Sequence, residues 1–253
     1  MHALITGASS GIGEAVAEVF AGAGYDITLV ARRQQELERV AAKVASGGVR
    51  TRAVACDLCD LDRMSALVQQ AEQKLGPIDV LVNNAGMQIV APVQEIDVEH
   101  AERLLRLNLM APLRLSRVAL RGMMERGRGT IVDVVSVASY LFPPFQSYYS
   151  ASKAALAAFS VTLRSELRKK GVHVVTVYPG PVKTAMGYQA LDGYAEDPMK
   201  GLPWGEADVL ARRILRAVER RSATVVYPRF YWIPRLFPGL ARLFMDRFGP
   251  GAR

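Results

Sequence analysis

The chain has 253 residues, of which 50% are hydrophobic and 22% are charged, and its formal net charge is +8 at pH 7. This apolar fraction excludes intrinsic disorder as a description of the whole chain and is enough for a sizeable core. Two cysteines cannot form a disulfide framework, which fits a reducing compartment or a fold that needs no cross-links.

Short apolar runs alternate with longer helical patterns along the chain. We expect strands at residues 3–6, 27–31, 52–55, 80–82, 131–135, 172–177 and 224–227. We expect helices at residues 12–23, 34–45, 61–75, 100–126, 150–169 and 206–220. Because the strand runs are continuously apolar, both faces of the sheet should be covered by helices. The repeated β-α-β units predict an α/β fold with a doubly wound parallel sheet.

We expect a single domain over residues 1–253, because nothing resembling an interdomain linker precedes Pro179. The segment 179–205 is typical of a loop, since it is rich in proline and glycine. In an open α/β sheet, an insert beyond the carboxyl end of a strand lies where ligands bind. Residues 185–205 are therefore the expected substrate loop.

The first strand run leads into a glycine-rich turn that precedes a helical pattern. Gly7, Gly11 and Gly13 allow a tight turn whose backbone amides can approach a pyrophosphate at the positive end of the helix. The same turn contains Gly7-Ala8-Ser9-Ser10-Gly11, a match to the nucleophile elbow of hydrolases with Ser9 as nucleophile. That alternative needs a downstream histidine, for which only His100 and His173 are available.

Five motifs in order give the chain a family resemblance over residues 3–184. They are Thr6-Gly7-x-x-x-Gly11-x-Gly13, Asn83-Asn84-Ala85-Gly86, Ser136, Tyr149-x-x-x-Lys153 and Pro179-Gly180-Pro181-Val182-Lys183-Thr184. Together they resemble the short-chain dehydrogenase/reductase family. The resemblance implies a one-domain Rossmann oxidoreductase that uses a nicotinamide cofactor on alcohols or carbonyls. It also implies a homodimer or homotetramer built on the helices that carry Asn108 and Tyr149.

The resemblance assigns cofactor contacts to a set of residues along the carboxyl edge of the sheet. These are Gly7, Ser9, Ser10, Gly11, Ile12, Gly13, Asp57, Leu58, Asn84, Ala85, Gly86, Tyr149, Lys153, Pro179, Gly180, Val182 and Thr184. Within this set, Asp57 would accept a hydrogen bond from the adenine amino group, with Leu58 packed nearby. Cys56 and Cys59 flank these two residues, but a single C-x-x-C is a poor basis for a zinc site or a redox motif, and we expect no metal.

The end of the second strand run indicates which cofactor is used. An acidic residue there would bind the ribose 2′-hydroxyl of NAD, yet the sequence has Arg32 and Arg33 and no acid until Glu36. A guanidinium can bind a 2′-phosphate through two hydrogen bonds and stack on the adenine. We therefore predict NADP(H) rather than NAD(H).

Tyr149 and Lys153 are four residues apart on one face of an expected helix. A nearby ammonium, together with the positive nicotinamide of an oxidised cofactor, favours the phenolate and should lower the tyrosine pKa from about 10. The phenol could then exchange a proton with the substrate oxygen, which the Ser136 hydroxyl would hold. The resemblance gives Asn108 the role of linking the lysine to a water chain, although a helical asparagine can also simply satisfy a backbone group.

The net charge is concentrated in the C-terminal part of the chain. Residues 206–253 hold ten arginines and four acidic residues, a balance of +6, whereas the remaining 205 residues carry +2. From residue 228 onward, apolar residues recur at helical spacing between arginines, as Ile233, Phe237, Leu240, Phe244 and Phe248 do. This basic aromatic tail could lie on a membrane surface, pack on its own core or form a subunit interface.

The sequence thus predicts an NADP(H)-dependent oxidoreductase that interconverts a carbonyl and an alcohol. The segments expected to contact substrate, 137–146 and 185–205, are apolar and aromatic, which favours an apolar or lipid-like compound. A non-catalytic dinucleotide-binding regulatory protein is the other alternative, although it would be expected to have lost Tyr149 or Lys153. No nucleic-acid reading module accompanies the arginines, and no apolar run is long enough to span a membrane. We expect a cytoplasmic protein, membrane-peripheral if the tail binds lipid.

Overall fold

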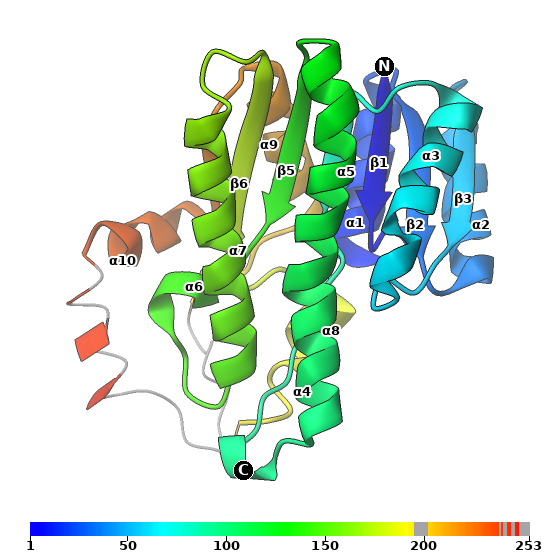
Figure 1. Cartoon of the computed structure of the whole chain (residues 1–253). Coiled ribbons are helices and arrows are strands. Elements are labelled where there is room, and N and C mark those ends of the chain that lie inside the picture. The colour runs from blue at the N-terminus through cyan, green and yellow to red at the C-terminus, as the bar shows by residue number, and fades with distance from the viewer. Residues whose placement is uncertain (195–201, 238, 240–241, 244–245, 248–253) are drawn as a thin grey trace.

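The computed structural model describes residues 1–194, 202–237, 239, 242–243 and 246–247. Seven strands form one parallel sheet in the order β3-β2-β1-β4-β5-β6-β7 (Figure 1). Their bounds are β1 (His2–Thr6), β2 (Asp26–Ala31), β3 (Thr51–Ala55), β4 (Val80–Asn83), β5 (Gly129–Val134), β6 (Val172–Pro179) and β7 (Thr224–Tyr227). The predicted doubly wound parallel sheet is confirmed, and each predicted strand overlaps an observed one.

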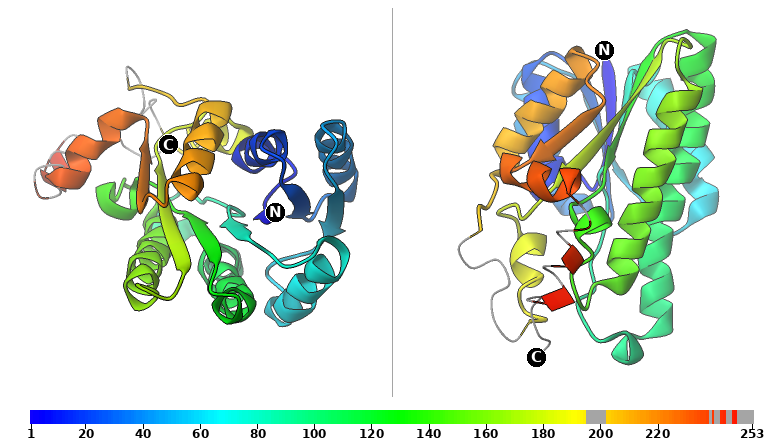
Figure 2. Two further views of the ribbon diagram at one scale, coloured as in Figure 1. Left: turned by 90° about the horizontal axis from the view of Figure 1, so that it is seen from above. Right: turned by 90° about the vertical axis from the view of Figure 1, so that its left-hand side faces the viewer.

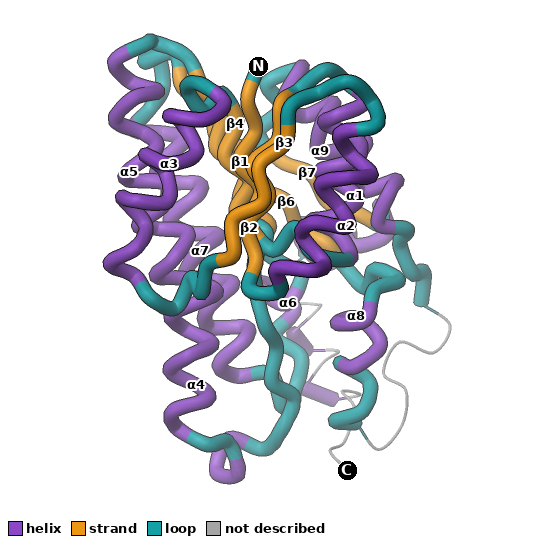
Figure 3. Tube along the Cα trace, turned by 90° about the vertical axis from the view of Figure 1, so that its right-hand side faces the viewer, coloured by secondary structure: helices purple, strands orange, loops and turns teal. Residues whose placement is uncertain are grey.

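Two layers of helices sandwich the sheet, as the view from above shows (Figure 2). One layer comprises α1 (Gly11–Gly22), α2 (Gln34–Ala45) and α9 (Ala207–Glu219). The other comprises α3 (Met64–Leu75), α5 (Ala111–Glu125) and α7 (Ser147–Glu166). Figure 3 shows the same layers from the β3 edge. No helix in the described residues is both long enough and apolar enough to cross a membrane.

Shorter helices lie mostly beyond the carboxyl ends of the strands. They are α4 (Val98–Leu105), α6 (Ala138–Leu141), α8 (Ala185–Gln189) and α10 (Trp232–Leu236), with 3-10 turns at Leu61–Arg63, Val93–Glu95 and Arg229–Tyr231. The helix predicted at residues 100–126 is interrupted, because a π-helical segment, Arg106–Met110, separates α4 from α5. Such a segment adds a residue to one turn and is frequent at functional sites. Periodicity alone did not reveal it.

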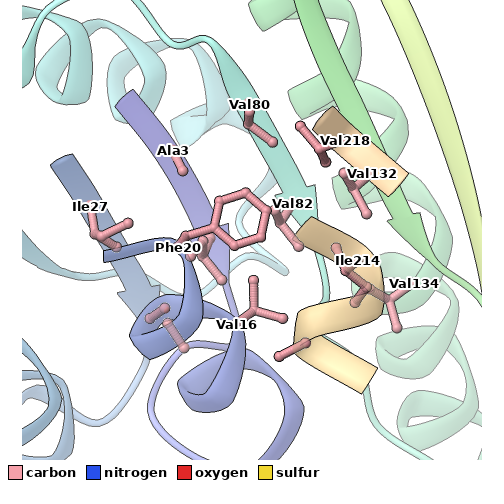
Figure 4. Close-up of a cluster of buried hydrophobic side chains, with 14 of the residues drawn as sticks. Ala3, Val16, Phe20, Ile27, Val80, Val82, Val132, Val134, Ile214 and Val218 are labelled. Atoms are coloured by element: carbon pink, nitrogen blue, oxygen red, sulfur yellow. The ribbon is translucent and has the colours of Figure 1, made fainter. Parts of the chain in front are cut away.

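Strand side chains alternate between two apolar cores. Ala3 and Ile5 face the layer of α1, α2 and α9, whereas Leu4 between them faces the layer of α3, α5 and α7. Because successive strand residues point to opposite faces, a strand covered on both sides must be apolar throughout. Phe20 of α1 lies at the centre of the first core, among valines of β4 and β5 and beside Ile214 of α9 (Figure 4).

The strand order places a crevice at the carboxyl ends of β1 and β4. The chain runs from β1 outward to β3 and then returns to pair β4 with the other side of β1. The connections after β1 and β4 therefore leave in opposite directions, and ligands of open α/β sheets bind at such a switch point. The glycine turn follows β1, and the Asn83-Asn84-Ala85-Gly86 motif begins with the last residue of β4.

We predict that Phe20→Ala lowers the free energy of unfolding by about 3–5 kcal/mol, because it removes a fully buried ring and leaves a cavity. The measurement is denaturant unfolding followed by circular dichroism. Val98→Ala, at a side chain that is 64% exposed on α4, is the matched control and should change stability by less than about 0.5 kcal/mol. Equal losses in the free energy of unfolding for the two variants would contradict the placement of Phe20 in the core.

Candidate active site

The glycine turn is a close junction of backbone between β1 and α1. Gly7 has a φ of 67°, and a Cβ there would come within 2.9 Å of the Cα of Ala85. A Cβ on Gly13 would overlap the carbonyl oxygen of Gly7 and lie 2.6 Å from the side-chain nitrogen of Asn84. Only glycine fits at either position, and the amides at the start of α1 stay uncovered by side chains. This cradle fits a pyrophosphate.

Thr6 joins the turn to the motif after β4. Its hydroxyl donates to the carbonyl of Val82 at 3.2 Å and accepts from the amides of Asn84 and Ala85, each at 3.0 Å. The Asn84 side chain donates back to the Thr6 carbonyl at 3.0 Å. The ends of β1 and β4 are thereby held together on either side of the crevice.

Arg33 reaches from the end of β2 to the glycine turn. Its guanidinium donates to the hydroxyls of Ser9 and Ser10, at 2.9 and 3.0 Å. Arg32 beside it is exposed. The Arg33 guanidinium and two hydroxyls thus lie together where the end of β2 meets the glycine turn.

The geometry gives Ser9 no histidine base. His2 bonds Thr28 and Gly76, and His173, at the amino end of β6, bonds the carbonyl of Ser222. His100 is exposed on α4, and none of the three hydrogen-bonds to Ser9 in the described part of the chain. The nucleophile-elbow alternative therefore lacks its catalytic partner.

Asp57 follows β3 and is already paired. One carboxylate oxygen accepts from the backbone amide of Cys59 at 3.0 Å, and the other lies 2.6 Å from a guanidinium nitrogen of Arg103. This ion pair was not predicted from the sequence, because Arg103 is 46 residues away from Asp57. Leu58 is buried, and both cysteines are free thiols. If Asp57 accepts a hydrogen bond from adenine, as predicted, its carboxylate must do so while it is bonded to the Cys59 amide and Arg103.

Tyr149 and Lys153 lie in the first two turns of α7, which begins three residues earlier than predicted. The ammonium of Lys153 lies 5.9 Å from the centre of the Tyr149 ring and donates to the carbonyl of Val134 at 3.0 Å. Ser136 follows β5, and its hydroxyl accepts from the amide of Ala138 at 3.1 Å and is close enough to the Tyr149 phenol to lower its pKa. The structure therefore brings the three predicted catalytic residues together at the carboxyl end of β5. Val135, which precedes Ser136, is buried in the core.

Burial dominates the electrostatics of this cluster. It raises the pKa of Tyr149 above its ordinary value, opposed by the hydrogen bond with Ser136. Burial also lowers the pKa of Lys153 to about 8, and the negative charge of Asp133 opposes that shift. The expectation that the lysine lowers the tyrosine pKa is therefore not met by these side chains alone, because the ammonium is held on a strand carbonyl and is only partly charged near pH 8.

Asp133 is a charged residue in the middle of β5 that the sequence did not single out. Burial raises the pKa of Asp133 to about 6, opposed by Asn83, Ser160 and Lys153. In the sheet register Asp133 pairs with Asn83 of β4 and Thr176 of β6, so a polar row crosses three central strands. The Asn83 side chain donates to Asp133 at 2.8 Å. In the sequence, Asp133 could have been noticed because it is a carboxylate inside an otherwise apolar strand run.

Asn108 lies in the π-helical segment and is fully buried. Its side chain accepts from the amide of Met87 at 2.9 Å and donates to the Met87 carbonyl at 2.8 Å and to Ser152 at 3.2 Å. These contacts fit the simpler role considered for Asn108, in which a helical asparagine satisfies backbone groups. Gly86 is close as well, since a Cβ there would lie 3.2 Å from the Asn108 oxygen and 3.5 Å from the Lys153 nitrogen. The link from the lysine to a water chain stays a prediction.

The segment Pro179–Thr184 borders the crevice on the β6 side. The carbonyl of Pro179 accepts from the amide of Val137, and Val182 is buried and pairs with Gly205. Thr184 caps α8 by accepting from the amide of Gly187 at 3.1 Å, and its methyl group lies 3.2 Å from the position of a Cβ on Gly11. Residues 179–184 and the glycine turn thus meet across the site.

The two predicted substrate segments pack together over the site. Tyr194 is 1% exposed, and its hydroxyl accepts from Gln146 at 2.8 Å and donates to the carbonyl of Pro144 at 3.0 Å. Phe142 and Phe145 have φ values of 50° and 64°, a strained conformation for bulky side chains that is common at ligand sites. Residues 195–201 of the predicted loop lie outside the described part of the chain.

Apolar side chains also surround Tyr149. A cluster of buried and half-buried residues places Leu104 and Ala138 against it, with Met87 and Ile89 packed on them. Met87 and Ile89 were not predicted to line the site, because they lie in an irregular segment after β4 that has no periodicity. The walls nearest the candidate proton donor are thus mainly apolar.

Comparisons with known proteins agree with this geometry. A family model described as short chain dehydrogenase matches residues 1–194. A fatty acyl-CoA reductase of Mycobacterium tuberculosis is 43% identical over 187 residues, which are 72% of this chain and 63% of that protein, less than two thirds of its length. The ketoacyl reductase HetN of Nostoc is 34% identical over 225 residues, covering 88% of this chain and 77% of that protein.

Among solved structures, a short-chain dehydrogenase from Sphingobium yanoikuyae in complex with NADPH superimposes with a TM-score of 0.82. It is 32% identical and covers 98% of this chain and 95% of its own. The motifs, the sheet order, the grouped Ser136, Tyr149 and Lys153, and the family model all agree: the chain belongs to the short-chain dehydrogenase family of oxidoreductases.

Proposed function

We propose that the chain is an NADP(H)-dependent reductase of apolar carbonyl compounds, with Tyr149 as the proton donor. The observation that carries the proposal is the convergence of Tyr149, Lys153 and Ser136 beside the glycine turn. The family acts on alcohols and carbonyls, and the curated relatives named above are reductases.

In this proposal, one residue of the site orients the substrate oxygen and another transfers the proton. A bound nicotinamide cofactor would supply the hydride. The Ser136 hydroxyl would hold the substrate oxygen beside the Tyr149 phenol, and the phenol would donate its proton to that oxygen as negative charge develops. The raised pKa of Tyr149 keeps the phenol protonated at neutral pH, which suits a proton donor. The Lys153 ammonium, 5.9 Å from the centre of the Tyr149 ring, would be the nearest positive side chain to the phenolate that results once the cofactor and substrate are bound.

The preference for NADP(H) rests on the positive charge of Arg33 at the glycine turn. A guanidinium already bonded to Ser9 and Ser10 is oriented for a phosphate on the adenosine ribose. No acidic side chain lies at the end of β2 to bind a free 2′-hydroxyl there. The similar structure from Sphingobium yanoikuyae holds NADPH, which supports the same choice.

Apolar walls favour an apolar substrate. Met87, Ile89, Leu104 and Ala138 surround Tyr149, and the cationic side chain nearest to the loop base, Lys183, is paired with Glu206. A regulatory protein on this fold has no need for a buried ammonium and phenol in contact with a serine hydroxyl. The retained cluster therefore favours an enzyme over that alternative.

We predict that Tyr149→Phe lowers the turnover of NADPH-dependent carbonyl reduction by roughly 10²–10⁴-fold, because it deletes the transferable proton while keeping the ring. The measurement is NADPH absorbance against a panel of aldehydes, ketones and lipid-like carbonyls. Tyr148→Phe, which removes a hydroxyl but keeps a ring that packs on the same apolar cluster, should leave turnover nearly unchanged. Near-normal turnover by Tyr149→Phe would disprove the mechanism.

We predict that Arg33→Ala weakens NADPH binding by roughly 10–100-fold, the effect of losing a charge-assisted contact, and leaves NADH binding almost unchanged. The measurement is cofactor fluorescence titration with each dinucleotide. Arg52→Ala, at an exposed arginine of β3, is the matched control. If Arg33→Ala weakened both cofactors equally, or the unaltered protein bound NADH more tightly than NADPH, the assignment of NADP(H) would be wrong.

A further inference from the structure

The short helix α10 is attached to the body of the protein through its charged side. The guanidinium of Arg235 lies 4.1 Å from the centre of the Tyr178 ring and 5.7 Å from that of Tyr140. Tyr231, just before the helix, is 3% exposed, and its ring lies 2.6 Å from where a Cβ on Gly180 would be. Its carbonyl accepts from the Tyr140 hydroxyl at 2.8 Å.

The apolar side chains of this region point away from the body. Ile233, Leu236 and Phe237 are 57%, 66% and 61% exposed. A surface helix normally buries its apolar stripe and exposes its charges. Here the arrangement is reversed, because the arginine stacks inward on tyrosine rings while the aliphatic and aromatic residues are exposed. Among the described residues, this apolar face is therefore not covered by the core of the protein.

The exposed apolar surface continues around α10, which projects from the β7 edge of the sheet (Figures 1 and 2). Phe230 and Trp232 are 47% and 36% exposed. We call Phe230, Trp232, Ile233, Leu236 and Phe237 together the α10 face. The later members of the predicted helical spacing, Leu240, Phe244 and Phe248, lie outside the described residues.

The charge of residues 228–253, which include the α10 face, is predominantly positive. This segment contains five arginines and one acidic residue, Asp246. Arg229 and Arg247 are exposed, whereas Arg242 lies 3.8 Å from Asp246. A partner of the α10 face must therefore accept apolar side chains and carry negative charge at its surface.

We propose that the α10 face docks on an anionic membrane surface. Aromatic and aliphatic side chains flanked by arginines are suited to the boundary between acyl chains and anionic headgroups. A second copy of this chain fits less well, because a two-fold contact would bring the arginines of both copies together. This inference is independent of the proposed reaction, since none of its residues holds cofactor or exchanges a proton.

The test is co-sedimentation of the full-length protein with phosphatidylcholine vesicles that contain or lack phosphatidylglycerol. We expect binding to the anionic vesicles, weaker binding to the neutral ones, and a decrease as salt is raised. Leu236→Ser/Phe237→Ser should reduce binding about tenfold or more, because it removes apolar side chains from the docked face. Val93→Ser/Val98→Ser is the matched control, since these side chains are 57% and 64% exposed elsewhere.

A second set of variants tests the electrostatic contribution to vesicle binding. Arg229→Gln/Arg247→Gln should weaken binding to anionic vesicles and leave binding to neutral vesicles unchanged, whereas Arg52→Gln/Arg63→Gln, at exposed arginines near the β3 edge, should change neither. Thermal unfolding midpoints equal to that of the unaltered protein show that each variant is folded.

Three results would overturn the proposal. The full-length protein could fail to sediment with anionic vesicles, or Leu236→Ser/Phe237→Ser could sediment as the unaltered protein does. Self-association that this variant abolishes, without vesicle binding by the unaltered protein, would assign the α10 face to a contact between copies.

Discussion

A buried ammonium constrains the arrangement of the whole site. Lys153 is 4% exposed, and removing its charge from water is costly unless the fold supplies partners. Both of its partners come from β5, as the carbonyl of Val134 and the negative charge of Asp133. The lysine is therefore held by the register of the central strands, with its ammonium 5.9 Å from the centre of the Tyr149 ring one helical turn away.

The strand order then determines which groups meet Lys153. Gly86 follows β4, and its missing side chain leaves room beside the Lys153 nitrogen and the Asn108 oxygen. Thr6 ties the same segment to the end of β1 and so to the glycine turn. The proposed proton-transfer residues after β5 and the proposed dinucleotide site after β1 are thus joined through the segment after β4. In the described residues, α10 lies outside this connection and exposes Ile233, Leu236 and Phe237.

Most of the fold was predictable because a sheet covered on both faces requires strands that are apolar throughout. The glycine turn, the paired asparagines and the Tyr149–Lys153 spacing were visible for the same kind of reason, since each satisfies a local geometric requirement. Contacts between distant residues were not visible. The pairing of Asp57 with Arg103, and of Asp133 with Asn83, depends on how strands and helices are juxtaposed. The π-helical segment at Asn108 escaped periodicity because it preserves the apolar pattern on both sides.

The most direct measurement of the central claim is an NMR titration of the lysine side-chain nitrogens, with Lys153 assigned from Lys153→Met. We predict that Lys153 titrates near pH 8, well below the reference pKa of about 10.4 for an unperturbed lysine. Asp133 is ionised there, because its pKa is about 6, and its charge favours the protonated lysine. Asp133→Asn should therefore move the Lys153 midpoint to lower pH. A midpoint shared with the exposed lysines, or one unmoved by Asp133→Asn in a folded protein, would contradict the proposed role of β5.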